Sequence, residues 1–257
     1  MKVLPSICII FEEDKLHLGI KNERVHFILF SVYIIFVALM NTIIVEGGKD
    51  MGNRIYPIGI QNFEKIRKEG YVYVDKTALM YKLVKSGSYY FLSRPRRFGK
   101  SLLISTLEAY FEAKRDLFEG LAVETLEKDW VKRPVLHLDL NIGKYDTPDS
   151  LDKILNETLD YWESLYGTRS AETTLALRFA GVVGRAYEQS GERVAILIDE
   201  YDKPLLQAIG NEELQREFRN TLKPFYGVLK TMDGCIKFAL LTGVTKFGKV
   251  SVFSDLN

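Results

Sequence analysis

The stretch Ser93-Arg94-Pro95-Arg96-Arg97-Phe98-Gly99-Lys100-Ser101 decides the fold of this chain, because its residue order is typical of a phosphate-binding loop. The residues before it, Tyr89-Tyr90-Phe91-Leu92, form an aromatic and apolar run that is typical of a buried strand. After it, apolar side chains recur at helical spacing as far as Phe111. We therefore predict that a strand, a basic turn and a helix follow one another here.

Arg94 is where this loop departs from the usual pattern, G-x-x-x-x-G-K-[ST], which has a glycine at that position. The alternative interpretation is a basic surface turn that happens to precede a helix. In a phosphate-binding loop, backbone N–H groups and the helix dipole face the anion. We then expect Lys100 to reach the β- and γ-phosphates and Ser101 to bind Mg²⁺. The residues predicted to contact nucleotide are Arg96, Arg97, Phe98, Gly99, Lys100, Ser101 and Leu102.

A second motif, Val194-Ala195-Ile196-Leu197-Ile198-Asp199-Glu200, predicts a strand that is buried on both faces and ends in two carboxylates. The carboxyl ends of strands form the edge of an open α/β sheet where ligands bind. Burying adjacent carboxylates is costly unless a cation accompanies them. We expect Asp199 to bind Mg²⁺ through water and Glu200 to orient the attacking water. A strand that ends in a solvated acidic turn is the alternative, but the two motifs together favour a nucleotide site.

Three segments together resemble the AAA-ATPase-like family of bacterial and archaeal proteins: residues 93–103, residues 198–205 and Leu241-Thr242-Gly243-Val244-Thr245-Lys246-Phe247. Two earlier segments match the family as well: Tyr56-Pro57-Ile58-Gly59-Ile60-Gln61-Asn62-Phe63 and Tyr73-Val74-Asp75-Lys76-Thr77. The resemblance explains Arg94 as a family trait and implies that ATP and Mg²⁺ are bound. In related ATPases, a polar residue at the position of Thr242 senses the γ-phosphate, so Thr242 joins Lys100 and Glu200 as a predicted catalytic residue. A threonine that caps a turn is the alternative.

We predict an α/β fold, a P-loop NTPase three-layer sandwich around a mainly parallel sheet. Its core strands are expected near Tyr89, Val135, Val194 and Ile236. Weak alternation also predicts a short strand over residues 71–74, and a further helical region is expected over residues 168–189. The resemblance implies that the Ile236 strand lies between the loop strand and the Asp199 strand. Relatives usually continue into a C-terminal domain that resembles a PD-(D/E)XK nuclease. This chain stops before such a domain, so we expect a C-terminal truncation and a nucleic-acid partner only through the missing part.

Residues 1–50 are expected to be an N-terminal extension, and residues 51–257 the ATPase-like domain. Residues 25–45 form an apolar run of about the length that spans a bilayer. One interpretation is a membrane anchor with the ATPase domain facing the cytoplasm. The other is a chain that begins naturally at Met51 and is cytoplasmic.

Several other residues have a functional and a structural interpretation. His137 is expected to be structural, without an obvious partner, and Asp139 to form a turn or cap. Asp202 could support the site or pair with Lys203. Arg216 and Arg219, on a helix predicted over residues 211–230, could act as an arginine finger in a homo-oligomer, although such arginines are usually solvated.

Composition narrows the function classes. The 257 residues include 35 Lys and Arg and 34 Asp and Glu. This near-neutral charge gives no sign that the chain as a whole binds nucleic acid. The two cysteines, Cys8 and Cys235, show no metal-binding spacing. An Asn-Lys-x-Asp signal for guanine is absent, which favours ATP. We expect an ATP hydrolase; the alternative is a nucleotide-regulated switch or scaffold for an effector domain, with little turnover.

Overall fold

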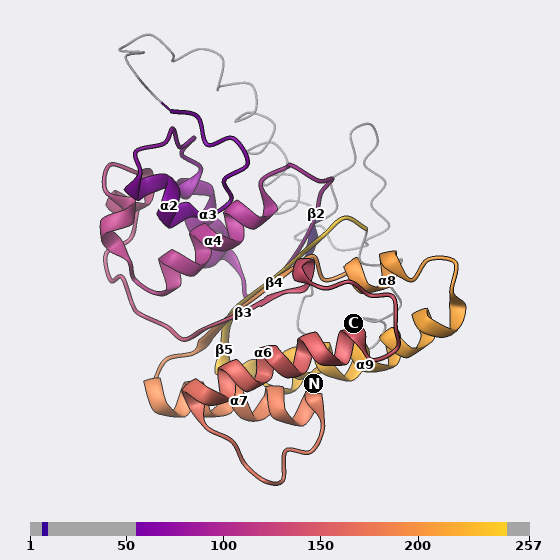
Figure 1. The fold of residues 1–257 in the computed structure, drawn as a ribbon. Helices are drawn as coiled ribbons and strands as arrows, with labels where there is room; N and C mark the ends of the chain where they lie inside the picture. Colours follow the sequence, from indigo (N-terminus) through magenta and orange to yellow (C-terminus); the bar gives the residue numbers. More distant parts are fainter. Residues whose placement is uncertain (1–6, 10–54, 246–257) are drawn as a thin grey trace, which may run out of the picture.

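The computed structural model describes residues 7–9 and 55–245, and the remaining residues are drawn as a grey trace in Figure 1. The apolar run at residues 25–45 and the alternative start at Met51 lie outside the described residues. Within the described ranges, no helix has the length and apolar character needed to cross a membrane.

The centre of the fold is a parallel sheet of five strands in the order β1-β2-β5-β4-β3. Their bounds are β1 (Ile7–Ile9), β2 (Tyr89–Ser93), β3 (Val135–Asp139), β4 (Val194–Asp199) and β5 (Ile236–Gly243). The four predicted core strands are all present, and β5 lies between β2 and β4 as the resemblance implied. The sequence did not predict β1, which pairs with β2 at the sheet edge.

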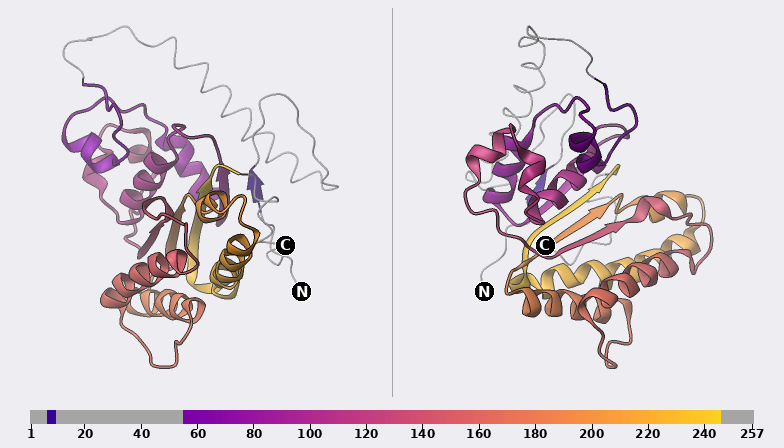
Figure 2. Two further views of the ribbon diagram at one scale, coloured as in Figure 1. Left: turned by 45° about the vertical axis from the view of Figure 1, so that its right-hand side comes forward. Right: turned by 60° about the vertical axis from the view of Figure 1, so that its left-hand side comes forward.

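Helices cover both faces of the sheet (Figures 1 and 2). One layer contains α2 (Phe63–Lys68), α3 (Thr77–Ser86), α4 (Lys100–Phe111), η1 (Arg115–Phe118) and α5 (Ala122–Leu126). The other contains α6 (Ser150–Tyr166), α7 (Leu175–Ser190), α8 (Lys203–Gln207) and α9 (Glu212–Thr231). Two short 3-10 turns, η2 (Leu140–Ile142) and η3 (Asp233–Cys235), follow β3 and precede β5. The predicted three-layer α/β sandwich is therefore confirmed.

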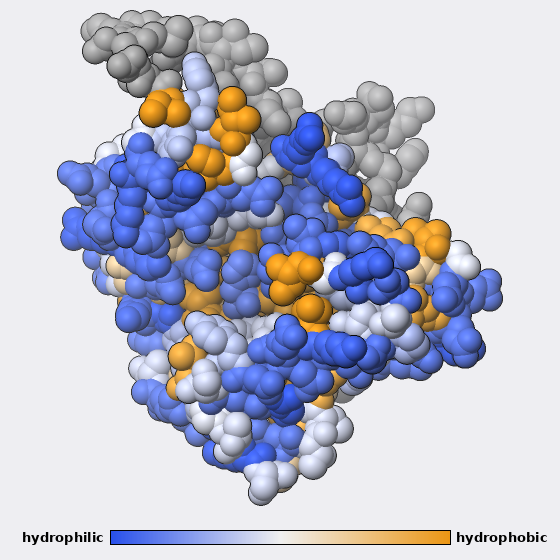
Figure 3. Space-filling view, viewed as in Figure 1, coloured by the Kyte–Doolittle hydropathy of each residue, from blue (hydrophilic) through white to orange (hydrophobic). Residues whose placement is uncertain are grey.

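The burial of strand β4 explains why the sheet lies between the two helical layers. All six of its residues are buried, as expected of a parallel strand covered on both faces. Leu197 packs into the core under α4, whereas Ile196 and Ile198 pack into the core under α6, α7 and α9. The face of the molecule in Figure 3 is mostly hydrophilic, with apolar residues in small patches. The hydrophobic residues therefore serve mainly to hold the two helical layers onto the sheet.

Two boundaries differ from the sequence prediction. The strand expected at residues 71–74 is absent; Tyr71 forms only an isolated bridge with Ile55. The helix expected to begin at residue 168 begins at Leu175, because Thr174 is extended and its hydroxyl accepts a hydrogen bond from the Leu177 N–H. Neither difference touches the carboxyl edge of the sheet, where the predicted site residues lie.

Candidate nucleotide site

The loop between β2 and α4 begins at the carboxyl edge of the sheet. The Arg94 N–H donates to the carbonyl of Gly243 at 3.0 Å, which ties the start of the loop to the end of β5. Gly99 immediately precedes α4 and has φ +75°, a left-handed conformation that favours glycine. A Cβ atom at Gly99 would meet no other atom within 4 Å, so the backbone conformation, and not crowding, accounts for glycine here.

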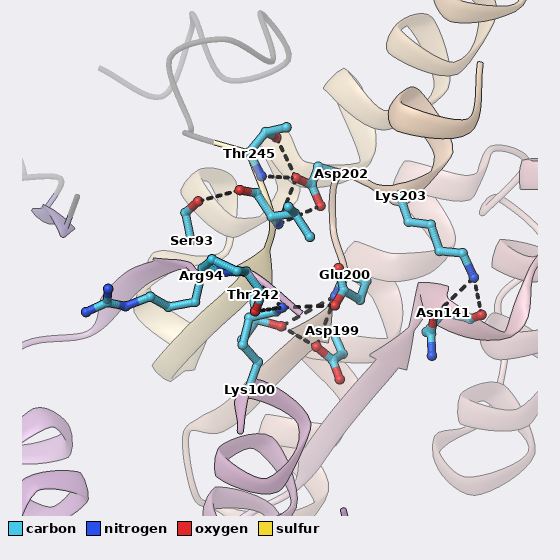
Figure 4. Close-up of polar contacts among 12 residues, drawn as sticks. Ser93, Arg94, Lys100, Asn141, Asp199, Glu200, Asp202, Lys203, Thr242 and Thr245 are labelled. Atoms are coloured by element: carbon cyan, nitrogen blue, oxygen red, sulfur yellow. Dashed lines mark hydrogen bonds and ion pairs between the residues drawn. The ribbon is translucent and has the colours of Figure 1, made fainter. Parts of the chain in front are cut away.

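Lys100, the first residue of α4, is only 4% exposed. Its Nζ atom donates to the carbonyls of Arg94 at 3.0 Å and Pro95 at 3.3 Å. It also lies 3.1 Å from Oε1 of Glu200 (Figure 4). A lysine ammonium has three protons to donate, so these three oxygens satisfy it. The loop is thus folded around its own lysine, which the acidic end of β4 helps to hold.

Asp199 and Thr242 connect the ends of β4 and β5. The Thr242 hydroxyl donates to Oδ1 of Asp199, and the backbone N–H of Glu200 donates to the same atom at 3.1 Å. Asp199 is 4% exposed and Thr242 is fully buried. Both hydrogen bonds that Asp199 accepts from the described residues go to Oδ1. Its second oxygen is therefore the one suited to a cation or to water bound to a cation.

Glu200 has an unusual backbone, with φ +53° in a residue that is not glycine. Such a conformation costs about 1–3 kcal/mol and persists only where the surroundings hold it. The N–H of Tyr201 donates to the carbonyl of Thr242 at 2.8 Å, and the N–H of Lys203 donates to the carbonyl of Glu200 at 2.9 Å. These bonds hold the turn that presents the Glu200 carboxylate to Lys100.

The other predicted nucleotide-contacting residues lie on the same loop and helix but not in the buried cluster. Arg96, Arg97 and Phe98 are exposed, and the two arginines make no hydrogen bond or ion pair with any residue in the described ranges. Ser101 and Leu102 lie half-buried on the first turn of α4, next to Lys100. The structure therefore brings together Lys100, Asp199, Glu200 and Thr242, and leaves the arginine pair on the surface.

Asp202 does not pair with Lys203, so that alternative was wrong. Asp202 instead accepts hydrogen bonds from the backbone N–H groups of Val244 and Thr245 and from the Thr245 hydroxyl. Lys203 reaches Asn141, after β3, and donates to its carbonyl and to its side-chain oxygen. The acidic turn at the end of β4 therefore contacts the segments that follow both neighbouring strands (Figure 4). No local sequence signal indicated these partners.

His137 has a partner that the sequence did not reveal. Its Nδ1 atom lies 3.5 Å from Oε2 of Glu108, on α4. Burial alone would lower the pKa of His137, but the Glu108 carboxylate, together with the charges of Asp139 and Asp199, outweighs burial and raises it. Asp139 accepts a hydrogen bond from the Asn141 N–H at 2.7 Å, so its expected cap role is confirmed.

The two candidate arginines of α9 have local partners. Arg219 donates to the side chain of Gln215 at 2.9 Å, and Arg216 lies 3.7 Å from the carboxylate of Glu213. Both partners lie on the same helix within one turn. An arginine-finger role for either residue remains a prediction.

The donor set of the cluster fits a nucleotide with Mg²⁺. Mg²⁺ is usually held by one or two protein oxygens together with substrate phosphates and water. Ser101, beside Lys100, and the second oxygen of Asp199 offer such ligands, and Lys100 offers a cation to phosphate. The residues present are therefore of the right chemical types for ATP and its metal.

Comparison with known proteins finds a family and a relative that resemble this chain. A family model described as "Predicted AAA-ATPase" matches residues 57–253. A protein of Azotobacter chroococcum mcd 1, described as an uncharacterized protein in the vnfD 5' region, is 43% identical over 209 residues. The match covers 80% of this chain and 40% of that protein, so the chain spans well under half the length of this relative. No solved structure matches the chain significantly.

Proposed function

We propose that this chain, which belongs to the predicted AAA-ATPase family, binds ATP with Mg²⁺ and hydrolyses it at the carboxyl edge of its sheet. The observation that carries the proposal is the buried cluster in which Lys100 contacts Glu200 while Thr242 contacts Asp199. These four side chains come from the ends of β4 and β5 and from the start of α4. A cation for phosphate, a carboxylate for the metal and a carboxylate for water are the parts that phosphoryl transfer to water requires.

Binding is assigned to the loop and the start of α4. Lys100 holds the β- and γ-phosphates, and Gly99 lets the backbone approach them. Ser101 and Asp199 hold Mg²⁺, which when bound neutralises charge on the phosphates. Thr242 keeps the Asp199 carboxylate oriented through its hydroxyl. The exposed Arg96 and Arg97 add positive charge at the mouth of the loop.

Chemistry is assigned to Glu200. A carboxylate close to the phosphate-binding lysine is suited to orient water and to accept its proton. The Lys100 ammonium is already satisfied by three oxygens, so a phosphate has to replace at least one of them. Glu200 is the one acceptor of the three that belongs to a side chain and can rotate away. Nucleotide binding and the release of Glu200 for catalysis are therefore expected to be coupled.

The Lys100–Glu200 pair also favours a second function, a nucleotide-regulated switch or scaffold with little turnover. If the pair persists with nucleotide bound, Glu200 is neutralised by Lys100 and activates water poorly. The chain would then bind ATP and report it to an effector without rapid hydrolysis.

Nucleotide binding and steady-state phosphate release distinguish these functions. The parent chain is tested with ATP and GTP, beside Lys100→Ala and the control Lys85→Ala, which removes a different lysine paired with Glu127. Hydrolysis requires that the parent bind and turn over ATP, that Lys100→Ala lose both, and that Lys85→Ala retain both. Binding without turnover would establish the switch. Absence of ATP binding, or equal binding by Lys100→Ala, would overturn both.

A further inference from the structure

Asp202 is a buried carboxylate that the proposed chemistry does not use. It is 0% exposed and lies two residues after Glu200. It accepts hydrogen bonds from the N–H of Val244 at 3.0 Å and the N–H of Thr245 at 2.5 Å, and another from the Thr245 hydroxyl. Burying a charged carboxylate is costly unless hydrogen bonds compensate it. All three donors belong to the segment that directly follows Thr242 and Gly243.

Tyr201 joins the same two segments. Its N–H donates to the carbonyl of Thr242 at 2.8 Å, and its hydroxyl donates to the carbonyl of Thr245 at 3.0 Å. A Cβ atom at Gly243 would lie 2.6 Å from Oδ1 of Asp202 and 2.6 Å from the Tyr201 ring. The turn at residues 200–202 and the segment at residues 242–245 are therefore in close contact, with no room for a side chain between them.

Two proposed catalytic groups lie at the ends of this contact. Thr242 directly precedes Gly243, and its hydroxyl contacts Asp199 and, at 3.4 Å, the N–H of Glu200. Glu200 keeps its φ of +53° only while its surroundings hold it. The hydrogen bonds of Asp202 are a principal part of those surroundings, because they bind the turn of Glu200 to the segment that carries Thr242.

We propose that Asp202 is a positioning residue of the ATP site, which holds Thr242 and Glu200 in place by binding Val244 and Thr245. The inference rests on the proposed ATP hydrolysis. Asp202 acts through those two groups and touches neither nucleotide nor metal. The negative charge of Asp202 matters because all three donors bind one oxygen, Oδ2, and charge-assisted hydrogen bonds are stronger than neutral ones. An asparagine oxygen would bind these donors more weakly, and its N–H group would face the Val244 N–H, whose nitrogen lies 3.3 Å from Oδ1.

The test is Asp202→Asn, which keeps the size of the side chain. We expect kcat for ATP to fall on the order of tenfold to a hundredfold, the scale of a small misplacement of catalytic groups. We expect KM for ATP to change less than about twofold, because the lysine and loop that bind phosphate are unchanged. The matched control is Asp75→Asn. Asp75 also accepts two backbone N–H groups and one threonine hydroxyl, but between α3 and α5.

A double-mutant cycle separates positioning from a merely structural role. Thr242→Val removes the hydroxyl through which Asp202 is proposed to act. If Asp202 works through Thr242, Asp202→Asn lowers kcat much less in the Thr242→Val background than in the parent. If Asp202 is merely structural, the fold-losses of kcat in the two single variants multiply in the double variant.

Thr245→Val covers the case in which Asp202→Asn shows no cooperative unfolding transition. It removes only the hydroxyl donor to Asp202, and kcat is expected to fall severalfold with KM unchanged. If Asp202→Asn folds and keeps the parental kcat, the inference is overturned. If Asp202→Asn does not fold, a parental kcat in Thr245→Val overturns it instead. Multiplicative effects on kcat in the double-mutant cycle also overturn it. A parent without turnover overturns the hydrolytic function and this inference together, whereas an active parent with unaffected variants overturns the inference alone.

Discussion

The Nζ atom of Lys100 lies 3.1 Å from Oε1 of Glu200, which joins the first residue of α4 to the residue after β4. The lysine is nearly buried, and its two other contacts are carbonyls of its own loop. In the proposed ATP complex, phosphate and Glu200 therefore compete for one ammonium group. This competition predicts how the loss of the Glu200 charge changes both the affinity for ATP and the rate of its hydrolysis.

Glu200→Gln is expected to separate binding from chemistry. Glutamine keeps an acceptor oxygen but has no negative charge to compete with phosphate for Lys100, so Kd for Mg-ATP should be equal to or lower than that of the parent. The general base is lost, so kcat should fall on the order of a hundredfold. Calorimetric binding and phosphate release measure the two quantities. Glu64→Gln, which breaks surface ion pairs with Lys68 and Lys114, is the control. A parental rate in Glu200→Gln would remove this residue from the mechanism.

Ser101→Ala and Asp199→Asn are expected to act through Mg²⁺. Asparagine can still accept from Thr242 through Oδ1, so Asp199→Asn removes mainly the charge available to the metal. The concentration of Mg²⁺ that gives half-maximal ATPase activity should rise in both variants, and this is read from a Mg²⁺ titration at saturating ATP. The matched control is Ser105→Ala, one turn further along α4. The Ser105 hydroxyl accepts a hydrogen bond from the Phe63 N–H and has no assigned role in binding the metal. An unchanged Mg²⁺ requirement would contradict the metal assignment of the residue concerned.

Replacing Arg96 and Arg97 together by glutamine is expected to weaken ATP binding and reduce its dependence on salt. Both side chains are exposed in the loop, where each pairing with phosphate contributes about 0.2–1 kcal/mol and is screened by ions. Kd is measured at low and high ionic strength. The control replaces Arg115 and Arg169, two exposed arginines elsewhere on the surface, and should leave Kd unchanged. Equal affinity in the Arg96 and Arg97 variant would indicate that both arginines are simply solvated.

His137→Gln is expected to change how stability depends on pH. The raised pKa of His137 means that its protonated form is favoured in the folded state, chiefly by Glu108 against the opposing effect of burial. That stability is fully present below the ordinary pKa of 6.5 and is lost as pH rises through the raised value. The variant should therefore lose more free energy of unfolding near pH 5.5 than near pH 9, as measured by urea denaturation.

Glu108→Gln provides the check on that explanation, because it removes the charge responsible while keeping His137. Most of the pH-dependent part of the stability should disappear, and the charges of Asp139 and Asp199 account for any remainder. A loss of free energy in His137→Gln that is equal at both pH values would show that His137 contributes by packing alone.

Local residue order was enough to predict the elements that carry the site. The apolar run before Ser93 predicts β2, and the Gly99-Lys100-Ser101 step predicts the start of α4 within one residue. The apolar run ending at Asp199 predicts β4. These signals are local because strand burial and helix initiation depend on neighbouring residues. The order of the strands followed from the family resemblance and was not visible in the spacing.

The sequence could not predict where tertiary contacts override local preference. Residues 71–74 alternate weakly, but Tyr71 finds only a bridge to Ile55 and no strand partner. An alternating segment becomes a strand only where another backbone pairs with it.

The late start of α7 at Leu175 has a local cause, the Thr174 cap, which apolar spacing alone does not reveal.

The residue pairs of the site were decided by the tertiary structure alone. Parallel pairing of β2, β5, β4 and β3 places their carboxyl ends along one edge, so polar residues distant in sequence come into contact there. Asp202 thus contacts Val244 and Thr245 although Lys203 is its neighbour, and Lys203 reaches Asn141 because β3 lies beside β4. The sequence determines which residues end each strand. Only the register between strands determines which partner each buried charge finds, because a buried carboxylate must take its hydrogen bonds from whatever segment lies within reach.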